Sequence, residues 1–246
     1  MKRLFKIIGL ILLFSLVSHP GMSEEVEEGA ARVIELVNTP TARLYPKGEY
    51  GLGLKIYDEG SLLFRFVLSL TDYVMLGVPL DIRHFIGKRA MEVKLPPVIW
   101  AKIRLTKKGS SWPMVIGYDP VNYGEEIDKR DGEEIDKRVR GLYLACTKPI
   151  YLGNLPVEWH FGANADLREF EHRGVCVFGG MGLFINPYLL FYSEVDGISF
   201  KSGKSSVLSL GIRYLSLERF ESDIGLRLVG DTTDRVVSFR YSHPLF

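Results

Sequence analysis

Cysteine is scarce in this chain, which has only two among 246 residues. Two thiols cannot build a disulfide-dense scaffold or an all-cysteine zinc site. An excess of one charge is also lacking, because 31 basic residues face 30 acidic ones and the net charge is +1. That balance excludes binding to nucleic acid through a strongly basic surface, and no nucleic-acid partner is expected. With 46% hydrophobic residues, the chain is also too apolar to be disordered throughout.

Long hydrophobic runs are rare as well. The one that stands out, Ile7 to Val17, follows the basic residues Lys2, Arg3 and Lys6. It is shorter than the roughly 20 residues that a membrane-spanning helix needs, and it has the length of a signal-peptide core. Small residues up to Ser23 form a cleavage site. The sequence therefore predicts a signal peptide over residues 1–23 that is cut after export.

Alternation with a period of two is what the rest of the chain has in abundance. In one segment, Leu208 and Leu210 alternate with Ser209 and Gly211, and similar segments near ten residues long recur along the chain. This pattern is typical of strands with one apolar and one polar face, and we count about twelve of them. Residues 24–47 precede the first strand and are expected to form a periplasmic leader, either a short amphipathic helix or an irregular segment.

The class of the sheet depends on which face is buried. Segments near ten residues exceed the five or six usual in soluble sheets and match a tilted membrane span. The polar faces are rich in Gly and Ser, as in a confined lumen. We therefore predict an all-β protein in which residues 48–246 form a single antiparallel up-and-down transmembrane β-barrel. Its expected location is the outer membrane of a Gram-negative-type bacterium, and a soluble secreted β-barrel binding protein remains the alternative.

The connections between the predicted strands alternate in length, as in outer-membrane barrels. Short turns are expected at Thr71–Asp72, 107–110, 186–187 and 216–219, all on the periplasmic side. Residues 148–154 break this rule as a longer periplasmic connection. On the outer side, residues 124–130 and 132–138 carry the same seven letters, GEEIDKR, and are expected to form a solvated loop.

The alternation assigns each face its residues. The side chains predicted to face lipid are Leu52, Leu54, Phe64, Phe66, Leu76, Ile103, Trp159, Phe161, Phe191, Leu208, Leu210, Ile212, Leu226 and Phe239. The polar side chains predicted to face the lumen are Lys55, Arg65, Lys102, Arg104, Glu158, His160, Glu194, Asp196, Arg213, Glu221, Asp223, Arg227 and Arg240.

The predicted lumen mixes both signs of charge, which favours ion pairs that fill a narrow interior. A pore selective for an anionic sugar would need a one-sided basic lining. His160 is the only candidate for hydrolase chemistry, and no G-x-S-x-G motif accompanies it. The sequence thus predicts a non-enzymatic protein with no cofactor and no metal site. A passive narrow pore for small solutes and, more weakly, a lipid-modifying hydrolase are the alternatives.

One stretch carries a family resemblance. The motif Asn38–Arg43 (NTPTAR), the turn Leu70–Asp72 and the segment Met75–Val78 (MLGV) make residues 38–78 resemble the YjbH-like outer-membrane β-barrel family, which is linked to exopolysaccharide production. The resemblance implies an outer-membrane barrel that assists envelope polysaccharide export or assembly. The partners it implies are outer-membrane lipids, the outer-membrane assembly machinery and polysaccharide-export components. It supplies no catalytic motif.

Overall fold

The structure is a computed structural model that describes residues 30, 32–57, 60–93, 98–122, 127–130, 133–136, 139–166, 170, 174–199, 206–216, 219–229 and 232–245. The predicted signal peptide lies outside these residues, as does the beginning of the leader. Within the described residues, no helix has the length and apolarity that crossing a membrane requires.

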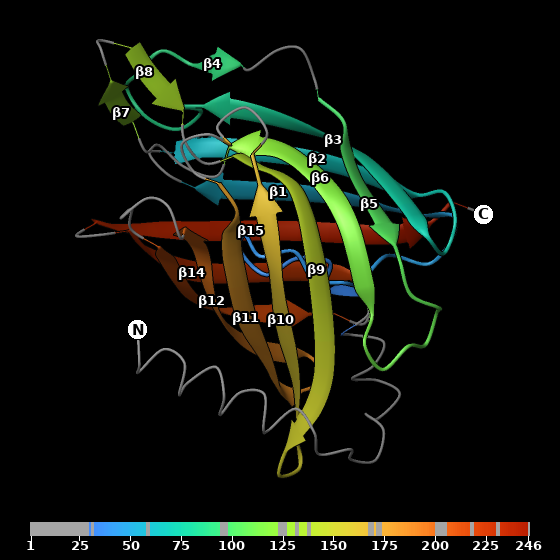
Figure 1. The fold of residues 1–246 in the computed structure, drawn as a ribbon. Helices are drawn as coiled ribbons and strands as arrows, with labels where there is room; N and C mark the ends of the chain where they lie inside the picture. The colour runs from blue at the N-terminus through green and yellow to red at the C-terminus, as the bar shows by residue number, and fades with distance from the viewer. Residues whose placement is uncertain are drawn as a thin grey trace.

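Twelve antiparallel strands form one closed ring (Figure 1). In ring order they are β1 (Glu49–Tyr57), β2 (Ser61–Ser69), β3 (Val74–Arg83), β5 (Trp100–Arg104), β6 (Met114–Asn122), β9 (Val139–Leu152), β10 (Leu155–Ala165), β11 (Cys176–Asn186), β12 (Leu189–Ser199), β13 (Val207–Leu215), β14 (Phe220–Val229) and β15 (Thr232–Pro244). Pairing of β15 with β1 closes the ring, so no barrel strand is left with a free edge. The predicted up-and-down barrel of about twelve strands is confirmed.

Three shorter strands lie in the connections. β4 (Glu92–Val93) pairs with the end of β3. β7 (Ile127–Arg130) and β8 (Glu133–Asp136) pair only with each other, and they are formed by the two copies of the duplicated sequence. The duplication therefore folds as a self-paired hairpin in the long connection between β6 and β9.

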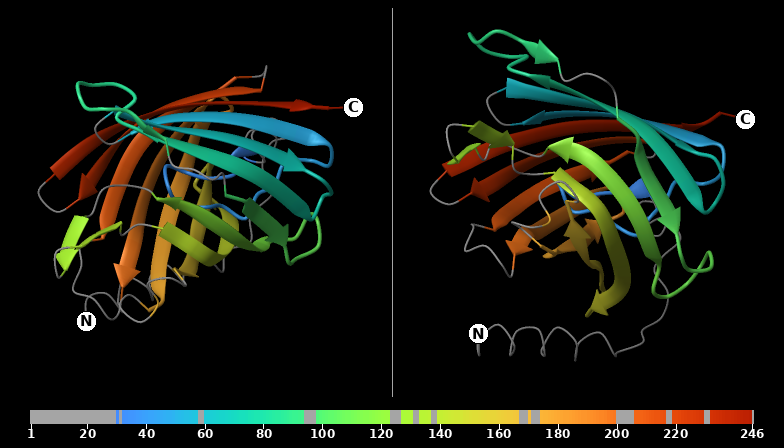
Figure 2. Two further views of the ribbon diagram at one scale, coloured as in Figure 1. Left: turned by 90° about the horizontal axis from the view of Figure 1, so that it is seen from above. Right: turned by 45° about the horizontal axis from the view of Figure 1, so that its top comes forward.

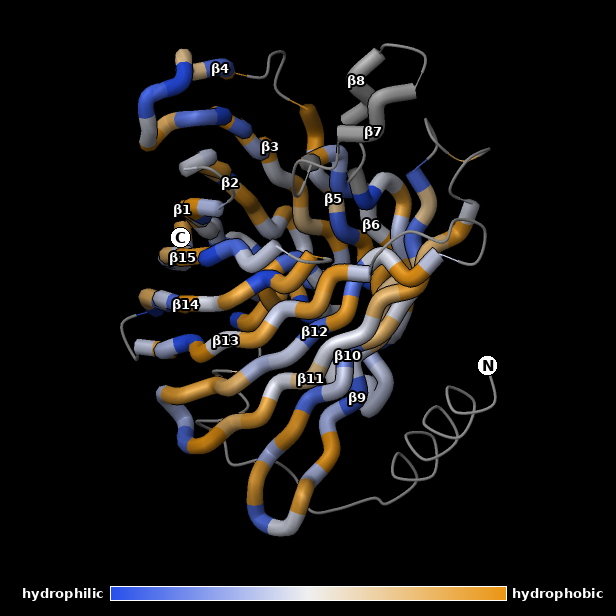
Figure 3. The backbone as a smooth tube through the Cα atoms, turned by 90° about the vertical axis from the view of Figure 1, so that its left-hand side faces the viewer, coloured by the Kyte–Doolittle hydropathy of each residue, from blue (hydrophilic) through white to orange (hydrophobic). Residues whose placement is uncertain are grey.

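The outer face of the barrel is an exposed apolar belt. Side chains such as Phe64, Leu210 and Leu226 point outward and are exposed around the ring. Figure 3 shows the resulting alternation of hydrophobic and hydrophilic positions along the strands. A continuous apolar surface of this extent needs a hydrophobic environment, and a bilayer provides one around a closed barrel.

Short turns connect the strands at the end of the barrel where β1 begins and β15 ends, and at the opposite end the connections from β1 to β2 and from β14 to β15 are short as well. The turn between β9 and β10 is also short, because both strands continue through the region that the sequence analysis treats as a longer connection. Leu152 pairs with Leu155, so the turn consists of Gly153 and Asn154. The expected exception at residues 148–154 is wrong, because Lys148 and Pro149 interrupt the apolar alternation without ending the ladder.

Inward glycines make room for inward aromatic rings on the neighbouring strand. Directly paired partners are Gly117 with Tyr143, Gly162 with Phe178, and Gly211 with Tyr192. A Cβ atom at any of these glycines would collide with the paired ring. The lumen is thus narrowed by aromatic rings as well as by charged side chains.

The N-terminal segment ahead of β1 lies inside the barrel. In both views of Figure 2, this blue segment runs within the ring of strands. Among its residues, Val33, Leu36, Val37, Ala42 and Tyr45 are at most 2% exposed. The leader expected in the periplasm is found in the lumen over residues 32–47, because its apolar side chains are buried against the inward aromatic rings. Ala30 and Arg32 are helical, and residues 33–47 form no helix.

Candidate functional site

Residues 32–47 fill the lumen as a hairpin, which we call the plug. Glu35 and Pro40 form an isolated antiparallel bridge, and the amide of Leu36 donates to the carbonyl of Thr39 at 2.9 Å. Arg32 donates to the carbonyl of Ser216 at 2.8 Å, in the short turn between β13 and β14. The other end of the plug continues directly into β1. Both ends therefore lie at the end of the barrel with the short turns, and the tip points toward the opposite end.

The buried charges around the plug are sorted into two walls. On β13–β15, β1–β3 and β5, the described buried residues are the cations Lys55, Arg65, Lys102, Arg213, Arg227 and Arg240 against the acids Glu49, Asp81, Glu221 and Asp223. We call this side the cationic wall. On β6 and β9–β12 the described buried charged residues are the cation Arg140 and the acids Asp119, Glu158 and Glu194. We call this side the acidic wall. The plug lies between two surfaces of opposite net charge.

The cationic wall binds main-chain carbonyl groups of the plug. Lys102 Nζ donates to the carbonyls of Ile34, Thr41 and Arg43 at 2.8, 3.1 and 3.2 Å. Arg213 donates to those of Glu35 and Leu36 at 2.8 and 3.0 Å. Lys55 donates to the carbonyl of Val37. These cations help to satisfy the hydrogen-bonding capacity of buried plug carbonyls, as burial demands.

The acidic wall binds main-chain amides of the plug. The Glu194 carboxylate accepts hydrogen bonds from the amides of Val37, Asn38 and Thr39 at 2.9–3.1 Å. At the same tip, Arg140 donates to the carbonyl of Asn38 and to Asp196, each at 2.7 Å. The carboxylate thus compensates three amides of a tight turn that lack a backbone acceptor.

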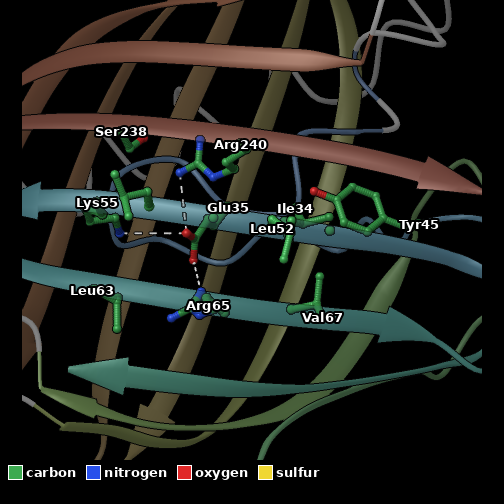
Figure 4. Close-up of a pocket in the computed structure, with 13 residues that line it drawn as sticks. Ile34, Glu35, Tyr45, Leu52, Lys55, Leu63, Arg65, Val67, Ser238 and Arg240 are labelled. Atoms are coloured by element: carbon green, nitrogen blue, oxygen red, sulfur yellow. Dashed lines mark hydrogen bonds and ion pairs between the residues drawn. The ribbon is translucent and has the colours of Figure 1, made fainter.

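Glu35 places the plug's own carboxylate against the cationic wall (Figure 4). Its oxygens lie 2.5 Å from Arg65, 3.4 Å from Arg240 and 3.7 Å from Lys55. Burial alone would raise the pKa of the Glu35 carboxyl, but the positive charges of Arg65, Lys55 and Arg240 outweigh it and hold the pKa well below its ordinary value. The cavity beside this cluster is about 20 Å³, which is room for a single water molecule.

Arg43 places the plug's cation against the acidic wall, where it pairs with Glu158. The amide of Ala42 donates to Thr147 Oγ1 at 2.8 Å, and the Thr147 hydroxyl is hydrogen-bonded to His160 Nδ1, 2.9 Å away. The remaining ring nitrogen of His160 lies 3.8 Å from Glu158. His160 is therefore part of the network that holds the plug, which supports a structural role.

Apolar contacts add to these polar ones. Plug residues Val33, Leu36 and Val37 pack in a cluster with the inward side chains of Phe184 and Tyr192. Ile34, Ala42, Leu44 and Tyr45 pack in a second cluster with Trp100, Tyr143 and Phe178, among others. Burial of a side chain such as Leu36 or Ile34 contributes about 1.5–3 kcal/mol. The docked plug is thus a buried part of the folded chain.

The structure places the predicted lumen residues as follows. Buried on the inner face are Lys55, Arg65, Lys102, Glu158, His160, Glu194, Arg213, Glu221, Asp223, Arg227 and Arg240. Arg104 and Asp196 are half-buried. The predicted lipid-facing side chains are exposed, apart from Leu54 and Trp159, which are half-buried. Within the described residues, no group of His, Cys, Asp and Glu side chains is arranged to hold a metal ion.

The plug itself contributes residues to the site that are not predicted from the sequence. Glu35 and Arg43 supply charge to the lumen, and Asp119, Arg140 and Thr147 join its network. The signal for a filled lumen is present in the sequence as large aromatic residues on the otherwise polar faces, such as Tyr143, Phe178 and Tyr192. Such rings in a lumen need packing partners.

Comparisons with known proteins identify the fold alone. No protein-family model matches the chain. No curated protein matches its sequence. Among solved structures, a KdgM porin superposes with a TM-score of 0.51 at 9% sequence identity, covering 79% of this chain and 99% of the porin. A second structure, described as "KdgM porin in complex with disordered oligogalacturonate", gives the same values. The outer membrane protein Omp33 of Acinetobacter baumannii matches over 79% of this chain and 97% of its own, with a TM-score of 0.49 and 8% identity. The chain thus has the fold of an outer-membrane β-barrel.

Proposed function

We propose that this protein is a passive channel for small hydrophilic solutes in the outer membrane of a Gram-negative-type bacterium, and that the plug closes it. The observation that carries this proposal is the contrast between the two surfaces of the barrel. The outside is an apolar belt suited to lipid, whereas the inside carries charges that bind the plug largely through its main chain. Water can replace such hydrogen bonds, so withdrawal of the plug would leave a hydrated lumen.

The fold comparison supports the same function. The KdgM structures are porins by their descriptions, and their fold is shared by this chain. No catalytic role is proposed, since His160 is engaged in holding the plug. This proposal favours the passive pore, which the sequence analysis gives as an alternative, over assistance with polysaccharide export. That role, its partners and the relationship to the YjbH-like family remain predictions that depend on residues 38–78.

A glycine against the plug offers a test in planar bilayers. A Cβ atom at Gly180 would lie 2.5 Å from Leu36 Cδ1, 3.2 Å from the Ser193 carbonyl and 3.3 Å from Glu194 Cβ. The two γ-methyl groups of Gly180→Val add further bulk on this side, which should weaken the seating of the plug. Overpacking of this kind costs about 1–3 kcal/mol, which corresponds to about fivefold or more in the open population. We expect rare openings for the parent protein and frequent, longer openings for the variant.

The neighbouring glycine provides the matched control. A Cβ atom at Gly179 meets only the carbonyl of His160, at 3.7 Å, so Gly179→Ala should conduct like the parent. Heat-modifiable migration in gels verifies that all three proteins are folded barrels. If all three proteins are folded and the bilayer stays sealed with each of them, the channel proposal is wrong.

A further inference from the structure

We propose that the space between the cationic and the acidic wall is a binding site for short zwitterionic peptides, and that the plug holds this site as a built-in competitor. This inference rests on the channel function proposed above and names the class of solute that the channel would favour.

The main-chain groups of the plug are oriented between the two walls. The carbonyls of Ile34, Leu36 and Val37 point to cations of the cationic wall. The amides of Val37, Asn38 and Thr39 point to Glu194 on the acidic wall. Each peptide group carries a dipole, and opposed rows of charge orient such dipoles across the lumen. A sugar has hydroxyl groups without this fixed polarity.

Most polar contacts between the plug and the walls do not depend on the plug's side chains. Lys55, Lys102, Arg213 and Glu194 all bind backbone atoms of the plug. Thr147 does so as well, through the amide of Ala42. Main-chain recognition of this kind accepts many sequences, as in other modes of peptide recognition. A free peptide could therefore make the same contacts.

The lumen accommodates one carboxylate and one cation of the plug, the two charges that the ends of a peptide carry. Glu35 shows that a carboxylate fits among Arg65, Arg240 and Lys55, at 2.5–3.7 Å. Arg43 shows that a cation fits against Glu158 on the other wall. A short peptide carries a terminal carboxylate and a terminal ammonium, and it can supply both charges at once. The lumen thus provides a place for each terminus and for the peptide groups between them.

Current recordings with defined solutes test this inference. The Gly180→Val channel is exposed in turn to tetraalanine, to tetraalanine acetylated and amidated at its ends, to sodium acetate and to raffinose. We expect tetraalanine to block the current at concentrations about tenfold below those of the three other solutes, because only it supplies both charges and the peptide groups.

Two variants locate the site. Glu194→Gln, in the Gly180→Val background, should weaken the block by tetraalanine about tenfold, because the acceptor of three amides loses its charge. Glu92→Gln, on the exposed β4 outside both walls, is the control and should leave the block unchanged. Glu35→Gln alters the plug and leaves the side chains of both walls unchanged. In an otherwise unaltered chain, this substitution should weaken docking of the plug, so tetraalanine should block the current at lower concentrations.

The outcomes separate the two proposals. Absence of current in every folded variant would refute the channel itself. Currents that tetraalanine and raffinose block equally would refute the peptide site alone. So would a Glu194→Gln channel that binds tetraalanine as tightly as its parent, or a Glu35→Gln protein with unchanged block.

Discussion

On β13, outward and inward side chains alternate, but they depend on their neighbours to very different degrees. The outward Leu210 lies in an apolar belt where any side chain of similar hydrophobicity would serve. The inward Arg213 is fully buried and bonded to Asp223, Glu221 and two plug carbonyls. The comparison teaches that the outer face is specified by composition, whereas the inner face is specified by partners. Four changes, ordered by expected effect, test this difference.

Removal of the charge of Arg213 should have the largest effect. Arg213→Leu removes one of the two cations, Arg213 and Arg240, that the buried carboxylates of Asp223 and Glu221 share. Loss of one member of a buried ion pair costs about 3–5 kcal/mol, measured as the free energy of unfolding by urea in lipid vesicles. Arg235→Leu, on the exposed end of β15, should leave this free energy nearly unchanged. Equal losses for both variants would contradict the comparison.

A charge on the outer face should cost somewhat less. Leu210 lies near the middle of β13, where an arginine would meet the acyl chains. We expect Leu210→Arg to lower the free energy of unfolding by about 2–4 kcal/mol, whereas Leu228→Arg near the end of β14 should cost about 0–1 kcal/mol. If the substitution at Leu210 proves harmless, that side chain faces water and the membrane assignment fails.

Acid should weaken the docking of the plug. The pKa of Glu35 is lowered in the docked state. The contribution of its carboxylate to plug docking is therefore complete above the ordinary carboxyl pKa of about 4.3 and is lost as the pH falls through the lowered value. We therefore expect the open probability to rise as the pH is brought below about 4. Glu35→Gln should open more at neutral pH and respond less to acid. Glu92→Gln, on the exposed β4, should behave like the parent, and identical pH profiles for Glu35→Gln and the parent would exclude this role.

The smallest effect is expected at an exposed ion pair. Lys108 and Asp72 lie 3.1 Å apart on two short turns, and the lysine side chain is 66% exposed. Such pairs contribute about 0–1 kcal/mol because water screens them, so Lys108→Ala should barely alter the free energy of unfolding. A loss of unfolding free energy comparable to that of Arg213→Leu would show that ion pairs stabilise the protein as much outside the lumen as within it.

The sequence predicts the outer face well because lipid imposes a local rule. Each strand must present apolar residues at alternate positions, so Leu208, Leu210 and Ile212 identify β13 without reference to any other strand. Closure of the ring follows from repetition of this rule over twelve strands. The rule fails locally where Lys148 and Pro149 interrupt the alternation, and there the sequence places a loop in the middle of β9.

The contents of the lumen could not be predicted in the same way. The sorting of charges between two walls depends on which strands face each other, and that arrangement exists only in the closed ring. The plug residues Val33, Ile34, Leu36 and Val37 have the spacing of an amphipathic helix, but the structure folds this segment as a hairpin. The burial of Val33 and Leu36 depends on Phe184 and Tyr192, more than a hundred residues later in the chain. Such non-local contacts leave only a weak trace in a single sequence.

The self-paired hairpin of β7 and β8 has a consequence for how this protein can vary. Each strand is contributed by one copy of an eight-residue tandem unit, and neither joins the barrel sheet. Gain or loss of units through replication slippage would lengthen or shorten this connection in steps of eight residues. The ladder between β6 and β9 would keep its register throughout. The connection can therefore vary in length while the barrel sheet keeps its pairing.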